Sequence, residues 1–584
     1  MQRQKRADIV IAGGGWVGLA MAKEIATRTS LSVVVLERGP ARKLADYAKG
    51  MDELDYFIRY RMMQNLADET VTHRHSIGAA AVPIRQYGSF NPGTGVGGAG
   101  EHWTGLSYRY FPDVFRLATV LREKHGASKL PQDLAVQDWG VTYEEIEPLY
   151  WRAEQMMGIG GKAGNLQGQR IEGGNIFEGP RSHEYPNPPH PPTYLAARFQ
   201  KAALELGYHP YPTPAATLSR TYRNPDGISR SGCAYCGYCM RHGCMIGAKA
   251  QPTNTLLPVL VKRNNFTLRP GCWVRRVVHR EGKAEGVTYL DSAGNEVLQP
   301  ADVVILSSWT LNNARLLLLS GIGEPYNPAT GKGTLGKNLT HQVGIGTQVF
   351  LDRHLNSFMG AGGLGVTVSD LDGDRGSDPA SGVLRGGSTR INSTGEGPIS
   401  SFGRIPPGEV QRNWGSDWKK AALQWHDKVA TITCEAEHLA YRQNFVDLDP
   451  AYTDKFGDPL LRLTLDWTDH ERRQSAVAAK VQQSIGKAMG GRIGGTVRGV
   501  GAHYSVTDYQ STHIQGGAIM GTSPGDSVVN PWFQHWRVPN LWVAGGSAFP
   551  QNASGNPTLT ILAMAYRAAD ALIGRYLKRP GALA

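Results

Sequence analysis

Residues 8–37 set the architecture of the chain, and they read DIVIAGGGWVGLAMAKEIATRTSLSVVVLE. The apolar run at 8–12 is typical of a buried parallel strand. Glycines follow it in the G-x-G-x-x-G spacing, then an amphipathic helical pattern, then a second apolar run that ends in an acid. Such glycines let the backbone approach a pyrophosphate, the helix N-terminus favours its negative charge, and the acid accepts hydrogen bonds from ribose hydroxyls. The segment therefore predicts a dinucleotide site that uses Gly13, Gly15, Gly18 and Glu37. This motif alone does not distinguish FAD from NAD.

Two other glycine-rich segments are expected to contribute to the same site. Residues 90–105 read FNPGTGVGGAGEHWTG, and their density of small residues favours backbone packed against a flat ligand; a surface turn is the alternative. Residues 541–572 read as a strand, a glycine loop and a long helix, so a strand from the C-terminal end would return to the nucleotide. The expected cofactor contacts in these segments are Gly97, Gly98, His102, Trp103, Gly545, Gly546 and Ser547.

The composition is that of an ordinary globular protein with a mildly basic surface. Of its 584 residues 41% are hydrophobic and 19% charged, which places the chain among folded rather than disordered proteins. The formal net charge is +12, but Lys and Arg are scattered without a long basic run, so we expect no nucleic-acid partner. No apolar stretch approaches the ~20 residues of a membrane helix, and the basic N-terminus runs directly into the first predicted strand. We therefore expect neither a signal peptide nor a transmembrane helix, so that export would require a partner.

Four of the six cysteines lie in the segment SGCAYCGYCMRHGC at 231–244. Their spacing is C-x2-C-x2-C-x4-C, at Cys233, Cys236, Cys239 and Cys244. Structural zinc usually takes two close pairs that are separated by a dozen or more residues. One short glycine-containing loop instead resembles the way ferredoxins wrap an iron–sulfur cluster, so we expect a cluster; zinc, a disulfide or free thiols are the alternatives. Cys272 and Cys434 are isolated and are expected to be buried small apolar residues.

Together these motifs resemble the glucose-methanol-choline (GMC) flavoprotein oxidoreductases. The family pattern includes GGGWVG with its acid, LLLLSGIG at 316–323 and LGKNL at 335–339, although the Ser-Pro usually found upstream of that run is absent. Within the family, the chain is most similar to the flavoprotein (large) subunits of membrane-bound gluconate 2-dehydrogenases. The shared stretches are PGTGVGGAGEHWTG, the four-cysteine loop, FVDLDPAY, THIQGGAIMG and SAFPQ. The resemblance runs from about residue 7 to the last predicted helix.

The resemblance implies an α/β protein of the GMC-type fold, with a Rossmann-like FAD-binding domain and a mixed-sheet α+β substrate domain. We expect the FAD-binding domain to be discontinuous, over 1–45, 215–345 and 495–584, with the iron–sulfur loop at 231–249. Residues 46–214 and 346–494 are then expected to form the substrate-binding domain and the segments that cover the flavin.

The resemblance also implies the cofactors. It favours FAD over NAD, and it implies a cluster of the [3Fe-4S] type with three cysteine ligands, so that one of the four is not a ligand. Cys236 is the one we set aside, because the neighbouring thiols crowd it. The text around His102 resembles the loop in which a His ring nitrogen bonds covalently to the flavin 8-methyl carbon. The alternative is that His102 or Trp103 only packs on the flavin.

His513 and Asn556 are the expected catalytic pair. Oxidation of an alcohol needs a base for the hydroxyl proton, and a neutral His can serve; an amide can hold the same oxygen and orient the C–H bond. In the GMC family these roles fall to the residues that match His513 in THIQGGAIMG and Asn556 in GNPT. For His513 alone a structural role would be the alternative, and for Asn556 the alternative is a helix N-terminal cap.

The family resemblance implies a dehydrogenase for a sugar acid or polyol, with D-gluconate oxidised to 2-dehydro-D-gluconate as the leading expectation. It also implies a small subunit with a twin-arginine (Tat) export signal, a membrane-bound multihaem cytochrome c subunit, and a place on the periplasmic face of the bacterial inner membrane. A neutral sugar or glycoside is the alternative substrate. An oxygen-using oxidase with a structural cysteine loop and a non-enzymatic electron-transfer flavoprotein are the alternative classes.

Overall fold

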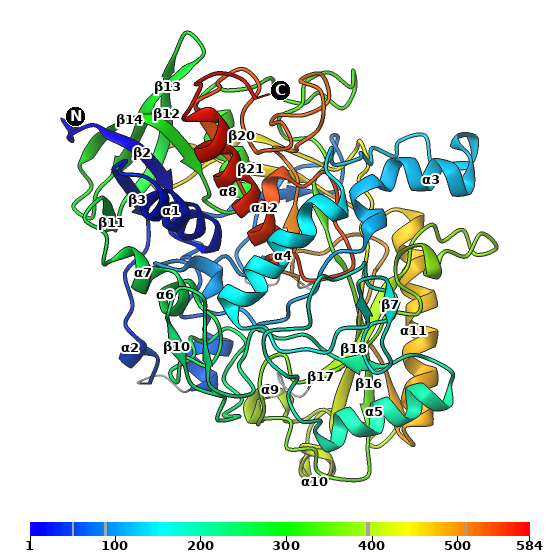
Figure 1. Cartoon of the computed structure of the whole chain (residues 1–584). Coiled ribbons are helices and arrows are strands. Elements are labelled where there is room, and N and C mark those ends of the chain that lie inside the picture. The colour runs from blue at the N-terminus through cyan, green and yellow to red at the C-terminus, as the bar shows by residue number, and fades with distance from the viewer. Residues whose placement is uncertain (49–51, 87–89, 393–396, 508, 510, 584) are drawn as a thin grey trace.

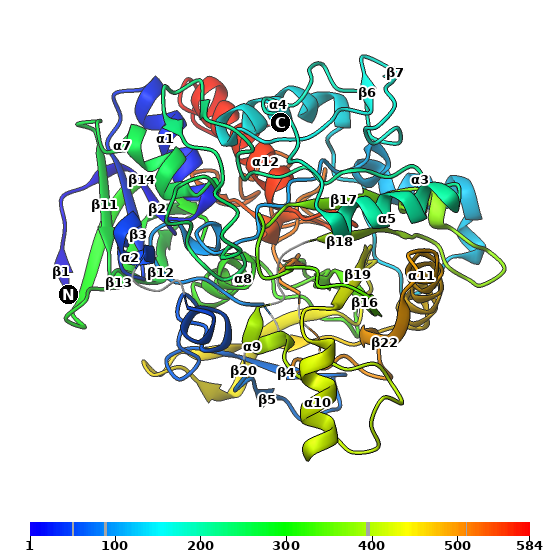
Figure 2. The same cartoon turned by 90° about the horizontal axis from the view of Figure 1, so that it is seen from below.

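The computed structural model describes residues 1–48, 52–86, 90–392, 397–507, 509 and 511–583. Two large sheets organise the chain, and they occupy opposite sides of the molecule in Figures 1 and 2. The blue N-terminal and red C-terminal segments meet where helix α1 (Trp16–Arg28) packs against helix α12 (Thr558–Ala571), so both ends of the chain build one region. No helix within the described part of the chain is long and apolar enough to cross a bilayer.

The first sheet has eight strands in the order β11-β3-β2-β14-β13-β12, and β1 and β24 also pair with β14. The neighbours from β11 through β14 are parallel, as are β1 and β24 with β14, whereas β12 and β13 form an antiparallel extension. Strands β2 and β3 are apolar and buried, as expected for parallel strands covered on both faces. The strands are β1 Gln2–Arg3, β2 Ala7–Ala12, β3 Val33–Glu37, β11 Phe266–Pro270, β12 Trp273–Arg280, β13 Lys283–Leu290, β14 Glu296–Leu306 and β24 Leu541–Val543.

Helices α1, α4 (Tyr143–Met157) and α12 pack beside this sheet, and their apolar side chains share its core. Helix α8 (Thr310–Leu319) follows β14 and packs against β12 and the four-stranded sheet described below. The helix α1 begins directly after Gly15, so its N-terminus faces the glycine loop at the end of β2. This is the position at which a Rossmann-like unit binds a phosphate group.

The second sheet has six antiparallel strands in the order β22-β16-β19-β18-β17-β8. One face packs against α5 (Tyr194–Glu205) and α11 (Asp469–Ala488), and that face is apolar. The alternating residues on the other face are polar, which leaves that face available to a ligand. The strands are β8 Tyr211–Pro212, β16 Val343–Phe350, β17 Gly365–Val368, β18 Gly387–Asn392, β19 Val429–Ala436 and β22 Arg492–Arg498.

A third sheet has four strands in the order β20-β21-β4-β5, with β4 and β21 parallel. Its strands are β4 Val71–Arg74, β5 Val82–Pro83, β20 Phe445–Thr453 and β21 Pro459–Thr464. Three short antiparallel pairs complete the strands: β15 Thr340–His341 with β23 Ile514–Gln515, β6 Asn165–Leu166 with β7 Gln169–Arg170, and β9 Tyr222–Arg223 with β10 Ser229–Arg230. The remaining α-helices are α2 Leu44–Ala48, α3 Leu117–His125, α6 Pro252–Thr255, α7 Leu257–Leu260, α9 Pro398–Ser401 and α10 Ser416–Trp425.

This architecture confirms the predicted fold class, a Rossmann-like parallel sheet beside a second α+β region. The strands of the first sheet come from residues 2–37, 266–306 and 541–543. The large sheet of the second region is entirely antiparallel, and the mixed sheet there is the four-stranded one. The domain boundaries remain a prediction.

Candidate active site

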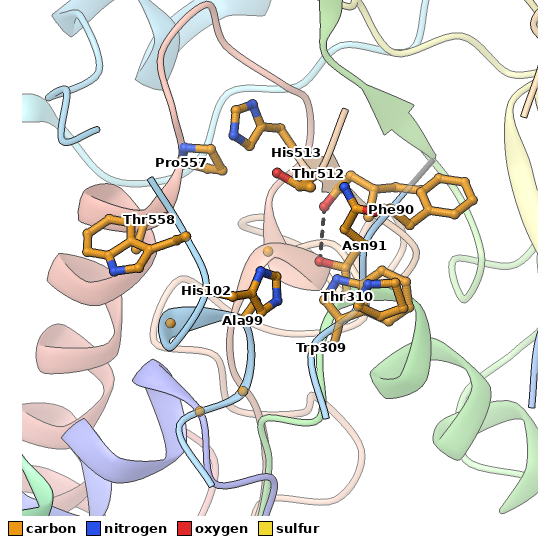
Figure 3. A pocket seen from close by; sticks show the side chains of 18 of the residues that line it. Phe90, Asn91, Ala99, His102, Trp309, Thr310, Thr512, His513, Pro557 and Thr558 are labelled. Atoms are coloured by element: carbon orange, nitrogen blue, oxygen red, sulfur yellow. Dashed lines mark hydrogen bonds between the residues drawn. The ribbon is translucent and has the colours of Figure 1, made fainter. Parts of the chain in front are cut away.

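One cavity of about 800 Å³ lies between the two large sheets, and it collects most of the predicted site residues. A volume in the range of several hundred Å³ to ~1,000 Å³ is typical of cofactor and ligand sites. The predicted residues that line it are Gly13, Gly15, Glu37, Gly98, His102, Trp103, His513, Gly545, Gly546 and Asn556. Figure 3 shows His102 and His513 in this pocket, together with Pro557 and Thr558 at the start of α12. The segments that carry the two histidines are far apart in the sequence.

The first glycine loop packs so closely against its neighbours that side chains would not fit at two of its glycines. Gly13 has a φ of +105°, and a Cβ there would lie 2.5 Å from the Ser307 carbonyl oxygen. A Cβ on Gly18 would lie only 2.0 Å from the Gly13 carbonyl oxygen, so helix α1 can start this close to the loop only with glycine. Gly18 therefore supports the loop from behind and does not line the cavity.

Glu37 lies at the end of β3, buried beside the glycine loop. Its carboxylate accepts hydrogen bonds from the backbone amides of Gly14 (2.9 Å), Gly39 (2.9 Å) and Gly95 (3.3 Å). Burial raises the pKa of this carboxyl, although the three amides and the Arg38 charge oppose that shift. A carboxylate offers about four acceptor positions, so Glu37 can still accept a ribose hydroxyl from the cavity.

The second and third glycine segments close around the first. The Gly97 amide donates to the Gly14 carbonyl (2.7 Å), which places Gly98 on the cavity and Gly97 behind it. Gly545 has a φ of +119°, and it lines the cavity with Gly546. Ser547 is fully buried and accepts from the Asn313 side chain (3.0 Å), so it fixes this loop from outside the cavity.

A Gly18→Ala substitution is expected to weaken FAD retention by roughly 10- to 100-fold. The new Cβ would overlap the Gly13 carbonyl, and overpacking of this kind costs about 1–3 kcal/mol. The measurement is the flavin-to-protein ratio after dialysis, judged from the visible absorbance. The matched control is Gly574→Ala, where a Cβ meets nothing within 4 Å and φ is not positive. Equal flavin retention in the two variants would contradict the role given to Gly18.

His102 is buried on the wall of the cavity, and its Nε2 atom has no hydrogen-bond partner among the described residues. Burial, together with the nearby Lys249 and Arg241 charges, lowers the pKa of His102 to about 3. The ring is therefore neutral at physiological pH. Gly93 leaves room for it, because a Cβ there would lie 2.8 Å from Nε2. A buried, unpaired ring nitrogen on the cavity wall fits a flavin that fills this space.

Trp103 lines the cavity as well and is held by its indole N–H, which donates to the Ala250 carbonyl (2.7 Å).

His513 and Asn556 are in direct contact at the other side of the cavity. The Asn556 side-chain amide donates to His513 Nε2 at 2.9 Å. The Asn556 side chain is not the cap of α12, because Pro557 occupies that position and no side-chain capping bond is present. Its Oδ1 atom has no partner among the described residues. The pair therefore presents an imidazole nitrogen and an amide group to a ligand.

Gln342 fixes which nitrogen of His513 carries the proton, and no sequence motif pointed to this residue. The short pair β15–β23 sets Thr340 opposite Gln515 and His341 opposite Ile514, which continues to Gln342 opposite His513. The Gln342 Nε2 donates to the carbonyls of Ala553 (2.9 Å), Ser554 (2.8 Å) and Gly555 (3.2 Å). Its Oε1 must therefore be the atom that faces His513 Nδ1, and Nδ1 must donate to it. The neutral ring then keeps its lone pair on Nε2, toward Asn556.

A Gln342→Met substitution is expected to slow flavin reduction by substrate roughly 10- to 100-fold, because the His513 ring loses its fixed tautomer and orientation. The measurement is the rapid-mixing rate of flavin bleaching against substrate concentration. We expect the limiting rate to fall while the substrate dissociation constant changes little. The matched control is Gln482→Met on α11. Gln482 is another buried glutamine with both ends bonded to β16 (Ile345 carbonyl 3.0 Å, Thr347 hydroxyl 2.7 Å), and it has no contact with His513. Equal slowing in both variants would indicate a structural role only.

The floor of the cavity on the substrate side is the polar face of the six-stranded sheet. Arg390 and Glu435 form a bidentate ion pair there, with N···O distances of 2.9 and 2.6 Å. The other floor residues are Gly344, Gly346, Gln348, Asn392, Thr431 and Thr433. The alternation of Thr431, Thr433 and Glu435 with apolar neighbours is a period-two signal that could have found the β19 part of this floor.

The four-cysteine loop packs directly against the loop that carries His102 and Trp103. The Arg241 amide donates to the His102 carbonyl (2.8 Å). Lys249 is fully buried, and its ammonium donates to the carbonyls of Trp103 (2.6 Å), Cys239 (2.8 Å) and His242 (2.8 Å). Burial lowers the pKa of Lys249, and the neighbouring cysteines and Glu101 oppose that shift. One cation thus ties the cysteine loop to the wall of the cavity.

The four cysteines do not pair with one another: all are free, Cys233 and Cys236 are half-buried, and Cys239 and Cys244 are buried. Backbone amides donate to two of the sulfurs, from Tyr235 to Cys233 (3.3 Å) and from Lys249 to Cys244 (3.5 Å). Burial and the neighbouring thiols raise the pKa of Cys239 to about 12, although the Lys249 charge opposes that shift. Cys272 and Cys434 are buried apart from this loop, as expected.

Two segments of the chain, residues 216–343 and 440–565, match family models described as GMC oxidoreductase. The chain is 41% identical to the gluconate 2-dehydrogenase flavoprotein of Pantoea cypripedii, over 99% of this chain and 95% of that protein. It is 26% identical to the fructose dehydrogenase large subunit of Gluconobacter japonicus, over 97% of this chain and 98% of that protein. Among solved structures, pyridoxine 4-oxidase from Mesorbium loti has a TM-score of 0.62 at 16% identity, over 98% of this chain and 100% of that chain, which supports the fold alone.

Proposed function

Because the chain belongs to the GMC oxidoreductase family, as its motifs predicted, it is an oxidoreductase of CH–OH groups, and we propose that it oxidises a sugar acid. The leading reaction is D-gluconate to 2-dehydro-D-gluconate with FAD as the oxidant. The 41% identity to a gluconate 2-dehydrogenase flavoprotein over nearly the whole of both chains supports this substrate class. The observation that carries the chemistry is the Gln342–His513–Asn556 chain of hydrogen bonds on the cavity wall.

In this proposal His513 is the base and Asn556 holds the reacting oxygen. A substrate hydroxyl would displace the Asn556 amide from His513 Nε2, donate its own proton to the Nε2 lone pair that this amide now contacts, and accept a hydrogen bond from the displaced amide. The O–H proton goes to Nε2, and the C–H bond breaks as the carbonyl forms. Bound FAD supplies the acceptor for the hydride and its two electrons. Gln342 accepts from Nδ1–H throughout, so the imidazolium that forms remains hydrogen-bonded on both nitrogens.

The residues that would hold FAD are those of the three glycine segments. The helix α1 N-terminus and the loop at Gly13 and Gly15 suit the pyrophosphate, and Glu37 suits the ribose. His102 and Trp103 lie at the wall that a flavin ring would contact.

We propose further that His102 bonds covalently to the flavin through its unpaired Nε2. After precipitation of the protein in acid, the yellow colour is expected to stay in the pellet. The His102→Ala variant is expected to release all of its flavin to the supernatant under the same treatment. Colour released from the unmodified protein would overturn the covalent bond and leave His102 as a packing residue.

We propose that the cysteine loop holds an iron–sulfur cluster that passes electrons out of the protein one at a time. The spacing of the sulfurs supports a cluster over zinc. Zinc with Zn–S bonds of about 2.3 Å needs sulfurs within about 4 Å of one another. Within the described part of the chain, the cysteine loop has no three sulfurs within 4.8 Å of one another, whereas a cluster is wider. The backbone amides that donate to Cys233 and Cys244 also suit cluster sulfurs. We propose that the cluster is of the [3Fe-4S] type and that Cys236 is the cysteine that does not bind it.

Cys233 and Cys236 are half-buried whereas Cys239 and Cys244 are buried, so part of the loop is open to solvent, which supports electron exit to another protein. One relative is named as the large subunit of a fructose dehydrogenase, which by that name has at least one further subunit. We propose two partners: a small subunit with a Tat signal that exports this chain as a passenger, and a membrane-bound multihaem cytochrome c. The place of action is then the periplasmic face of the inner membrane.

Paired substrates test the sugar-acid assignment. D-gluconate and D-sorbitol share one polyol chain and differ only at C1, where gluconate carries a carboxylate. Turnover of gluconate with a one-electron acceptor, and little turnover of sorbitol, glucose or fructose, is the expected result. Preference for a neutral sugar would keep the mechanism and overturn the substrate. Hydrogen peroxide formed in air at the rate of turnover would overturn the dehydrogenase in favour of an oxidase.

A further inference from the structure

Two histidines and one aspartate converge on the surface, outside the cavity described above. His75, Asp466 and His503 each offer one ligand atom, and these three atoms lie within 4.8 Å of one another. The Nδ1 atom of His503 is 2.7 Å from one Asp466 oxygen, and Nδ1 of His75 is 3.8 Å from the other. The two imidazole rings lie beside each other, with centroids 4.9 Å apart. We propose that these residues bind a divalent transition-metal ion of the Zn²⁺ class.

The distances suit such an ion. Four ligands at about 2.05 Å from a tetrahedral zinc ion lie about 3.3 Å from one another, and the observed separations bracket that value. Two imidazole nitrogens and a carboxylate oxygen form a donor set that favours zinc, nickel or cobalt over calcium or magnesium. The remaining positions would be filled by water, which can enter because His75 and His503 are 43% and 66% exposed. Binding would displace the proton that His503 now shares with Asp466.

The fold holds the carboxylate in place for this role. Strands β4 and β21 are parallel, with Arg74 opposite Thr464, so His75 and Asp466 both lie just beyond the carboxyl ends of neighbouring strands. The Asp466 oxygen nearer to His75 accepts from the amides of Trp467 and Tyr504, both at 2.8 Å. Ligands that are oriented by further hydrogen bonds in this way are typical of metal sites.

The third ligand connects this site to the base. His503 precedes His513 in the chain, and its neighbour Tyr504 bonds to His341 Nδ1 (2.9 Å). His341 bonds in turn to the Ser511 carbonyl (2.9 Å), two residues before His513. A bound ion would therefore join β4 and β21 to His503 and, through the Tyr504–His341–Ser511 contacts, to the neighbourhood of the base. We infer that zinc at His503 restrains these contacts and slows flavin reduction, a step that rests on the proposed role of His513.

Zinc binding is measured first and independently of activity. The measurement is calorimetric titration of tag-free, cluster-containing protein with ZnCl₂, which gives the number of zinc ions bound per protein. The His503→Ala and His75→Ala variants are each expected to bind one zinc ion fewer than the unmodified protein. The matched control is His209→Ala, which removes another exposed histidine (55%) whose Nδ1 lies 2.7 Å from a carboxylate, that of Asp370, without a second imidazole. The same number of zinc ions in all four proteins would overturn the site. A site lost instead in Cys239→Ala would place the zinc at the cysteine loop and overturn it as well.

Rapid mixing then tests the coupling. With substrate and without oxygen, ZnCl₂ is expected to slow flavin bleaching several-fold in the unmodified protein and in His209→Ala, but not in His503→Ala. Binding at the three residues with no effect on bleaching would overturn the coupling to His513. If the protein fails to bleach with any substrate tested, the proposed function fails, and the zinc titration still decides the site.

Discussion

Replacing His513 with alanine is expected to slow flavin reduction by substrate by about 10²–10⁴-fold, the range that a positioned general base contributes. The Nε2 atom of His513 is the acceptor for the hydroxyl proton, and it faces the Asn556 amide at 2.9 Å. The described residues place no second imidazole beside Asn556, so nothing replaces the base. The measurement is the limiting rate of flavin bleaching under anaerobic rapid mixing, at saturating substrate.

A double variant makes this prediction specific. Gln342 contacts the substrate only through His513 in this account, so adding Gln342→Met to His513→Ala is expected to cause no further slowing. Residues that act as one unit are strongly non-additive, whereas independent structural damage would multiply the two effects. Retained flavin colour controls for folding. A His513→Ala rate within threefold of the unmodified protein would contradict the base assignment.

Replacing Cys239 with alanine is expected to remove iron and acid-labile sulfide from the purified protein. Cys239 is the most buried of the four clustered cysteines. Its carbonyl also accepts from the Lys249 ammonium, which links the cysteine loop to the loop of His102 and Trp103. Flavin reduction by substrate should continue, because His513, Asn556 and Gln342 are untouched. Electron delivery to a one-electron acceptor such as cytochrome c should fall by more than about tenfold, since the exit path is lost.

The matched control for this variant is Cys434→Ala. Cys434 is also buried, but it lies on β19 and faces the apolar side of the six-stranded sheet, away from the cysteine loop. Iron, sulfide and cytochrome reduction should be unchanged there. Zinc in place of iron in the unmodified protein, or normal cytochrome reduction by Cys239→Ala, would contradict the cluster as the electron exit.

Much of the fold could be predicted because its signals are local. The apolar runs at β2 and β3, the glycines between them and the acid at Glu37 follow from rules about adjacent residues. The same holds for the C-terminal strand, loop and helix, which the structure places against the first sheet. The domain boundaries stay predictions, since strand counts alone do not define them.

The candidate site was only partly visible in the sequence. His513 and Asn556 stand in family motifs, but Gln342 stands in none, and only the pairing of β15 with β23 brings it opposite His513. Lys249 joins two loops that are 146 residues apart in sequence. The metal-binding triad likewise joins residues from three distant segments. No pattern of neighbouring residues encodes contacts of this range, because they depend on the register of strands that pair across the fold.

Anaerobic titration of the purified protein with D-gluconate tests the proposed substrate and the proposed cluster in one measurement. Flavin accepts two electrons and a [3Fe-4S] cluster accepts one, so full bleaching is predicted at about 1.5 equivalents of gluconate, because each gluconate delivers two electrons. An end point near 1.0 equivalent would contradict the cluster and leave a simple flavoprotein dehydrogenase. No bleaching by gluconate would contradict the proposed substrate itself.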